Sequence, residues 1–156
     1  FYLRQRYDSA AVYFRMALER DSLIAELHYN YGLSLFRTGQ LALAEAEFLR
    51  TADLSRGTLE FQASLFKNLG AVYVERKKFR AAVAHYKRSV ELYPGDAEAV
   101  YGLAHAYEAA GDFRQAQRWY RKFLKSATPA TAGQERLQHV KRRLKELERT
   151  RNADGR

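Results

Sequence analysis

The sequence predicts an all-α protein, a solenoid built from antiparallel helix pairs. Residues 96–123 read as two short helices joined by a Gly-Asp turn, and the same kind of unit reappears at residues 65–94 and 28–50. A repeat near 34 residues with two helices per unit is typical of helical-hairpin solenoids, in which each hairpin buries its apolar face on its neighbours. The chain has only two Pro, neither inside a predicted helix, which agrees with an all-helical fold.

The second helix of each unit carries a recurring pattern of side chains. An aromatic or aliphatic residue starts the helix, an Ala follows three residues later, and an aromatic residue comes four residues after that. Small side chains allow the two helices of a hairpin to approach closely, and the aromatic rings then fill the space between successive hairpins. The pattern is held by Tyr7, Ala10 and Phe14, by Leu41, Ala44 and Phe48, by Phe79, Ala82 and Tyr86, and by Phe113, Ala116 and Tyr120.

The first helices carry a matching buried face. At three- and four-residue spacing it holds Tyr31-Gly32 with Leu35, Leu69-Gly70 with Tyr73, and Leu103-Ala104 with Tyr107. Together the two patterns resemble the tetratricopeptide repeat, whose sequence pattern is W-x2-L-G-x2-Y…A-x3-F…P. The departures are His28, Phe66 and Val100 at the Trp position, and a closing Pro present only as Pro94 and, one place late, as Pro129. The resemblance implies a right-handed superhelix whose first helices line a concave face.

The pattern divides the chain into segments. We expect the end of a truncated repeat at 1–22, full repeats at 25–57, 59–96 and 97–130, a C-terminal capping helix at 131–150, and a disordered tail at 151–156. In the first segment we expect a turn at Gln5-Arg6 and a helix from Tyr7 to Glu19. Because the partner of this helix is mostly missing, we expect an open apolar end, covered by upstream sequence or by another chain. The chain starts at Phe1 inside a repeat, so we expect a piece of a longer protein.

The middle repeats have clear stop and start signals. Gly39 ends the first helix of one repeat, and Gly111 lies in the turn of another. The helix-start markers are spaced by 34, 38 and 34 residues. Four extra residues are about one helical turn, so we expect the helix that starts near Thr58 and ends near Arg76 to be one turn longer.

The last helix leaves the repeat pattern. Thr131 and Gln134 form a predicted capping box. Four apolar residues then share one helical face at a spacing of three and four: Leu137, Val140, Leu144 and Leu147. This segment resembles the capping helix that closes many tetratricopeptide arrays.

The residue types argue against chemistry in this chain. It has no Cys, and its four His are scattered without metal-ligand spacing. No nucleotide-binding or nucleophile motif is present. We therefore expect no enzyme activity, no metal and no cofactor. No apolar run approaches the roughly 20 residues needed to span a bilayer, and we expect a soluble domain. Its compartment stays open, with the cytoplasm favoured over the periplasm.

The resemblance implies a partner-binding groove along the first helices. Transferring the repeat positions gives six residues in each full repeat, of which we keep these as candidates: Tyr29, Asn30, Leu33, Phe36, Arg37, Lys67, Asn68, Ala71, Val74, Tyr101, His105 and Glu108. The other transferred positions hold Glu26, Ser64, Glu75, Glu98, Gly102 and Ala109. Tyr29, Leu33 and Phe36 add a second apolar stripe to their helix, which either contacts a partner or packs within the array. Asn30 and Asn68 occupy equivalent positions, where an amide can pair with the peptide bond of an extended ligand, but Gly102 interrupts this ladder.

The sequence therefore predicts a non-catalytic scaffold that binds a peptide or segment of a partner protein, not a small-molecule substrate. Two alternatives stay open. The first is binding of nucleic acid or another anionic partner through Arg76, Lys77, Lys78 and Arg80 and the basic last helix. Residues 57–94 carry seven basic against three acidic side chains, but residues 1–56 are balanced at seven each, which disfavours nucleic acid. The second is homo-oligomerisation through the open N-terminal end.

Overall fold

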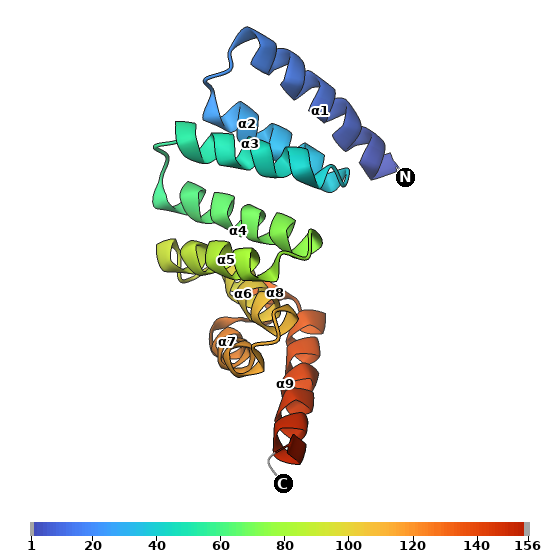
Figure 1. The fold of residues 1–156 in the computed structure, drawn as a ribbon, viewed down its shortest axis with the longest axis vertical. Helices are drawn as coiled ribbons and strands as arrows, with labels where there is room; N and C mark the ends of the chain where they lie inside the picture. The colour runs from blue at the N-terminus through green and yellow to red at the C-terminus, as the bar shows by residue number, and fades with distance from the viewer. Residues whose placement is uncertain (1, 155–156) are drawn as a thin grey trace.

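A computed structural model describes residues 2–154 of the chain, with side chains from 3 to 149. The helices stack one after another along the long axis of the molecule, and the last helix crosses the others steeply (Figure 1). The helices are α1 (Tyr2–Arg20), α2 (Ala25–Arg37), α3 (Leu41–Leu54), α4 (Leu59–Glu75), α5 (Phe79–Leu92), α6 (Ala97–Ala109), α7 (Phe113–Ser126), α8 (Pro129–Ala132) and α9 (Gln134–Asp154).

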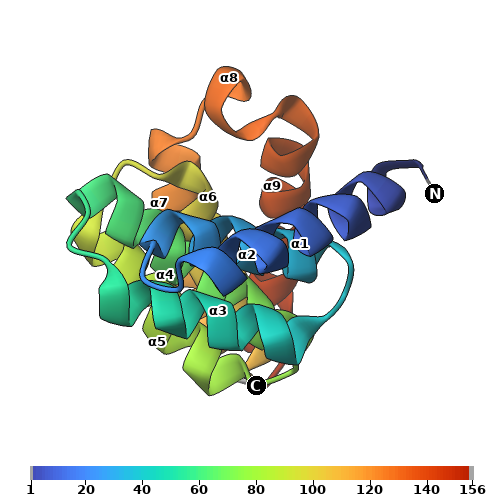
Figure 2. The same cartoon turned by 90° about the horizontal axis from the view of Figure 1, so that it is seen from above.

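Each helix contacts mainly its neighbours along the chain. The hairpins are α2 with α3, α4 with α5, and α6 with α7, while α1 packs on α2 and α9 packs on α7. Seen from above, α8 and the start of α9 lie on one side of the first helices, and the second helices α3 and α5 lie on the other (Figure 2). This near-neighbour packing is that of the predicted solenoid.

Close approach within each hairpin explains the small residues of the pattern. A Cβ added to Gly32 would lie 2.9 Å from the ring of Phe48, and one added to Gly70 would lie 2.7 Å from the ring of Tyr86. Both rings are buried, so the two helices meet with an aromatic ring against bare backbone. The glycine and the aromatic residue are therefore one packing unit, repeated in successive hairpins.

The extra turn expected from the marker spacing is confirmed. Helix α4 has 17 residues, whereas α2 and α6 have 13 each. The Thr58 side chain caps α4 by accepting a hydrogen bond from the backbone N–H of Phe61. At the turn that follows, Lys77 adopts φ 58°, the left-handed conformation that Gly39 and Gly111 adopt in the equivalent turns.

The ends of the chain differ from the predictions. The turn at Gln5-Arg6 is wrong, because α1 runs unbroken through it. No Gly or Pro interrupts this segment, and a turn would leave backbone groups unpaired that the helix satisfies. Residues 1, 155 and 156 of the predicted end segments lie outside the described residues.

The start of the last helix also differs. The capping box is formed by Thr128 and Thr131 and opens the short helix α8, and not by Thr131 and Gln134. Gly133, at φ 76°, then redirects the chain into α9. The tail expected from Arg151 is wrong up to Asp154, because α9 continues to that residue without a Gly or Pro to end it.

Asp96 holds the start of α6 through two interactions. Its Oδ1 accepts hydrogen bonds from the backbone N–H groups of Glu98 (2.9 Å) and Ala99 (3.1 Å), and its Oδ2 pairs with Lys67 Nζ at 2.7 Å. We expect Asp96→Ala to lower the free energy of unfolding by about 1–2 kcal/mol, because both the cap and the ion pair are lost. Asp96→Asn keeps an oxygen that can accept the capping hydrogen bonds, so its loss of unfolding free energy should be less than half that of Asp96→Ala. Urea unfolding measures both variants.

A matched control is Asp112→Ala, because Asp112 caps α7 through one hydrogen bond, to Gln115 N–H at 3.0 Å. Because only the capping hydrogen bond is lost, we expect Asp112→Ala to lower the free energy of unfolding by about 1 kcal/mol. Equal costs for Asp96→Ala and Asp96→Asn would show that the cap contributes nothing measurable.

Candidate functional site

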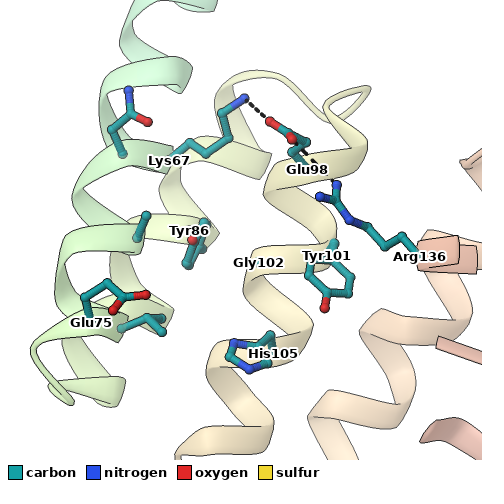
Figure 3. Close-up of a pocket in the computed structure, with 11 residues that line it drawn as sticks. Lys67, Glu75, Tyr86, Glu98, Tyr101, Gly102, His105 and Arg136 are labelled. Atoms are coloured by element: carbon teal, nitrogen blue, oxygen red, sulfur yellow. Dashed lines mark hydrogen bonds and ion pairs between the residues drawn. The ribbon is translucent and has the colours of Figure 1, made fainter. Parts of the chain in front are cut away.

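A cavity of about 300 Å³ lies between α4, α6 and the first turns of α9 (Figure 3). It brings together six of the predicted groove residues from two successive repeats: Lys67, Asn68, Ala71, Val74, Tyr101 and His105. Five further residues line it: Glu75, Tyr86, Glu98, Gly102 and Arg136. The first helices of neighbouring repeats form the two walls, and the capping helix closes one end.

A chain of ion pairs occupies the end of the cavity near the start of α6. Lys67 Nζ lies 2.7 Å from Asp96 Oδ2 and 3.4 Å from Glu98 Oε2, and Glu98 Oε1 lies 3.5 Å from Arg136 Nη1. The guanidinium of Arg136 also lies over the ring of Tyr101, 5.1 Å from its centre. Burial lowers the pKa of Lys67, but the hydrogen bond to Asp96 and the charges of Asp96 and Glu98 outweigh it and raise this pKa. The charges at this end therefore neutralise one another.

Two polar groups that line the rest of the cavity form no ion pair or hydrogen bond among the described residues: the carboxylate of Glu75 at the opposite end and the hydroxyl of Tyr86 between the two ends. The carboxylate of Glu75, the last residue of α4, is exposed and points from α4 toward α6 (Figure 3). Tyr86 is only 8% exposed, and its hydroxyl has no hydrogen-bond partner among the described residues. Burial, together with the carboxylates of Glu98, Glu75 and Asp96, raises the pKa of the Tyr86 hydroxyl, so it keeps its proton.

The aromatic stripe predicted on α2 packs within the array. Tyr29, Leu33 and Phe36 are partly buried against the core cluster that contains Phe48. The Tyr29 hydroxyl accepts a hydrogen bond from Asn68 Nδ2 at 2.9 Å, and burial raises the pKa of Tyr29. This interaction ties α2 to α4 and uses one donor of the Asn68 amide, whose carbonyl oxygen stays available.

The remaining predicted residues lie outside the cavity. Asn30 is half-buried and Arg37 is exposed on α2. Glu108 accepts hydrogen bonds from the Tyr120 hydroxyl at 2.8 Å and from Arg143 Nε at 2.6 Å. Glu108 therefore joins α6 to α7 and α9, and burial followed by this hydrogen bond raises the pKa of Tyr120.

The predicted set of groove residues omits the five further residues for different reasons. Arg136 lies on the capping helix, outside the repeat, so no repeat position points to it. Tyr86 holds the aromatic position of a second helix, which the pattern assigns to the core. Glu75, Glu98 and Gly102 occupy groove positions of the repeat, and the set kept as candidates leaves them out.

The two alternative functions, binding of an anionic partner and homo-oligomerisation, depend on two different surfaces. In the predicted basic stretch, Arg76 pairs with Glu45 of α3, and Lys78 lies over the ring of Tyr73 at 5.7 Å, so part of its charge is engaged. Helix α1 exposes large apolar side chains, including Leu3 at 66% and Tyr13 at 72%. The exposed face of α1 therefore mixes apolar side chains with charged ones such as Arg4, Arg6 and Arg15.

The described part of the chain contains no group of three or more His, Asp or Glu side chains that could hold a metal ion. Within residues 2–154, every helix is too short or too polar to cross a membrane.

The stacked helix pairs, with a glycine facing an aromatic ring in successive hairpins, define a helical-repeat solenoid. Two family models, both described as tetratricopeptide repeat, match residues 23–95 and 73–144 and together span most of the chain. The chain belongs to the tetratricopeptide-repeat family. Its fold class, an all-α right-handed superhelical solenoid of antiparallel helix pairs, is the one predicted.

Solved structures with the same fold include two described as MamA. One has 22% sequence identity and a TM-score of 0.70 and covers 77% of this chain, which spans 63% of that chain's length. The other has 18% identity and a TM-score of 0.73, covering 96% of this chain and 91% of that chain. A third, described as YrrB, a TPR protein with an unusual peptide-binding site, has 19% identity and a TM-score of 0.70, with 92% and 78% covered. At these identities the likeness establishes the fold. No curated protein sequence matches the chain significantly.

Proposed function

We propose that this protein is a non-catalytic scaffold that binds a segment of a partner protein in the groove formed by α4, α6 and the start of α9. The observation that carries the proposal is the cavity of about 300 Å³, which is lined by residues from two successive repeats. Tetratricopeptide arrays are interaction scaffolds as a family, and one protein with this fold is described as having a peptide-binding site.

The composition of the cavity suits a peptide. Ala71, Val74 and the face of Tyr101 offer apolar surface, while the Asn68 carbonyl oxygen and the Tyr86 hydroxyl offer hydrogen bonds. Gly102 has no side chain, and the ring of Tyr86 lies against it, so this ring and the α6 backbone form the floor of the cavity. Apolar contacts would supply most of the affinity, and ordering a flexible segment would oppose it. We therefore expect roughly micromolar binding of an isolated peptide.

Filling the cavity from within tests the proposal. Peptides that bind the protein are first selected from a displayed random library. Ala71→Gln places a longer side chain in the cavity, and we expect it to weaken binding of the selected peptides by about tenfold or more, which equals a loss of about 1.4 kcal/mol. Fluorescence anisotropy with labelled peptides measures the affinities, and circular dichroism checks that the variant is folded.

The matched control is Ala84→Gln on α5, because Ala84 is exposed and lies outside the cavity. This variant should bind as the natural sequence does. If Ala71→Gln binds every selected peptide with unchanged affinity, the ligand lies elsewhere and the proposed site is wrong.

A further inference from the structure

Among the residues with described side chains, 3–149, no cation forms an ion pair with the carboxylate of Glu75, which lines the cavity. Lys67, Glu98 and Arg136 are joined to one another, and with Asp96, at the other end. A ligand that bound those groups would first have to break existing ion pairs. Glu75 is exposed on the wall of the cavity and is free to accept hydrogen bonds from a ligand.

The hydroxyl of Tyr86 is a second group without a hydrogen-bond partner among the described residues, and Tyr86 lies between the ion-paired end of the cavity and Glu75 (Figure 3). The ring of Tyr86 is buried, and the residue lines the cavity. Its hydroxyl makes no hydrogen bond within residues 3–149 and faces the open cavity, where it can accept a hydrogen bond from a ligand. Figure 3 shows Tyr86 at the cavity floor, between the walls that carry Glu75 and Gly102. A ligand donor reaching this floor would satisfy the hydroxyl oxygen.

Glu75 adds a carboxylate that no cation of the described residues balances. It is one of the carboxylates that raise the pKa of the Tyr86 hydroxyl. An unbalanced carboxylate favours a positive charge on the ligand. Between this floor and the opening, Ala71 and Val74 offer apolar contact for the methylene groups of a long side chain.

From these observations we propose that the cavity binds a basic side chain, arginine or lysine, of the partner segment. The charged head donates hydrogen bonds to the Glu75 carboxylate and the Tyr86 oxygen, and the methylene stem packs on Ala71 and Val74. This inference rests on the proposed function and names the ligand chemistry of the same site. A charge-assisted hydrogen bond is roughly twice as strong as a neutral one, so the head group would set the specificity of the site.

The attraction is local and not a property of the whole molecule. The chain carries a formal net charge of +9, which repels a basic segment at long range. Contact with Glu75 and Tyr86 must therefore supply the preference. Added salt screens both the local attraction and the long-range repulsion, so we expect binding to depend only weakly on ionic strength.

Blocked tripeptides provide a direct test. Gly-Arg-Gly and Gly-Lys-Gly are titrated against the protein while its amide resonances are followed by NMR, alongside the citrulline, norleucine and glutamate analogues. Citrulline has nearly the shape of arginine without its charge. We expect the arginine or lysine peptide to shift the amides of Ala71, Gly102 and His105, and the three analogues to leave them in place.

Variant proteins then identify the responsible charge. Glu75→Gln should weaken binding of the basic peptide by roughly three- to tenfold, since the head group loses its ionic acceptor. Glu60→Gln is the matched control, because it removes the same charge from an exposed position at the other end of α4 and should change nothing.

Each other outcome overturns the inference. Equal binding of the citrulline or norleucine peptide would show that the charge is not recognised. Tighter binding of the glutamate peptide would show that Lys67 or Arg136 dominates. No shift with any peptide, or an unchanged affinity in Glu75→Gln, would equally exclude the site. The proposed function and this inference can be told apart. Library-selected peptides that lack a basic residue but lose binding in Ala71→Gln would support the groove and refute only its specificity for a basic side chain.

Discussion

Replacing Phe48 by Ala is expected to lower the free energy of unfolding by about 3–5 kcal/mol. Phe48 is fully buried, and its ring fills the space over Gly32, where a Cβ would lie 2.9 Å from ring atoms. The ring of Tyr29 also packs on it, with 5.8 Å between ring centres. Since Gly32 has no side chain that could move into the space, the substitution leaves a cavity that the hairpin cannot close.

The effect should be confined to the N-terminal half of the array. The buried residues form two clusters, one containing Phe48, Leu65 and Leu69 and the other containing Tyr86 and Tyr120. The clusters meet in the α4–α5 hairpin, where Tyr73 packs against both and Gly70 lies against the ring of Tyr86. Stability in such arrays is close to a sum of repeat and interface contributions. Hydrogen exchange should therefore show loss of amide protection in α2 and α3 with protection retained in α6 and α7.

The control for this prediction is Phe113→Ala. Phe113 is the same residue type at the start of α7 but is 52% exposed, so we expect a cost below about 1 kcal/mol. Uniform loss of protection across all helices in Phe48→Ala would contradict the two-cluster argument and show that the array unfolds as one cooperative unit.

Most of the fold follows from local patterns in the sequence. The Gly-aromatic pairs Gly32 with Phe48 and Gly70 with Tyr86 recur because both helices of a hairpin must meet at one place, so they mark the repeat wherever it occurs. The extra turn of α4 follows from counting residues between markers. Such features depend on contacts within one hairpin, and the residues that make these contacts recur at a fixed spacing that can be read from one sequence.

The candidate site is harder to predict because it depends on contacts between segments. Arg136 reaches the cavity only because Gly133 turns the chain from α8 into α9, and the repeat period has no place for it. Tyr29 was a candidate for the groove from its helical position, yet Phe48 and Phe61 of neighbouring helices surround its ring. Helical position indicates a face, whereas the packing of adjacent helices decides which residues on that face stay accessible.

Gly102 shows how the core limits the groove. It occupies the repeat position that holds Asn30 and Asn68 in the preceding repeats, so the asparagine ladder stops there. A Cβ at Gly102 would lie 2.5 Å from Cζ of Tyr86 and closer still to Cε1. The ring of Tyr86 therefore occupies the space that a side chain at this position would need.

We expect Gly102→Ala to destabilise the protein by about 2 kcal/mol. Overpacking at such a contact costs about 3 kcal/mol, and the higher helix propensity of Ala offsets about 1 kcal/mol. Gly95→Ala is the control, because the nearest atom to an added Cβ there is 4.0 Å away and its expected cost is near zero. Urea unfolding measures both variants.

A double-mutant cycle attributes the cost of Gly102→Ala to one contact. In the background of Tyr86→Ala the ring is gone, so adding Gly102→Ala should be neutral or stabilising, with a coupling energy of about 2 kcal/mol or more between the two sites. If Gly102→Ala costs the same in both backgrounds, the strain lies in the α6 backbone and not against Tyr86. Because Tyr86 forms the cavity floor, the single variant should also weaken binding of library-selected peptides, which links the packing of this hairpin to the shape of the groove.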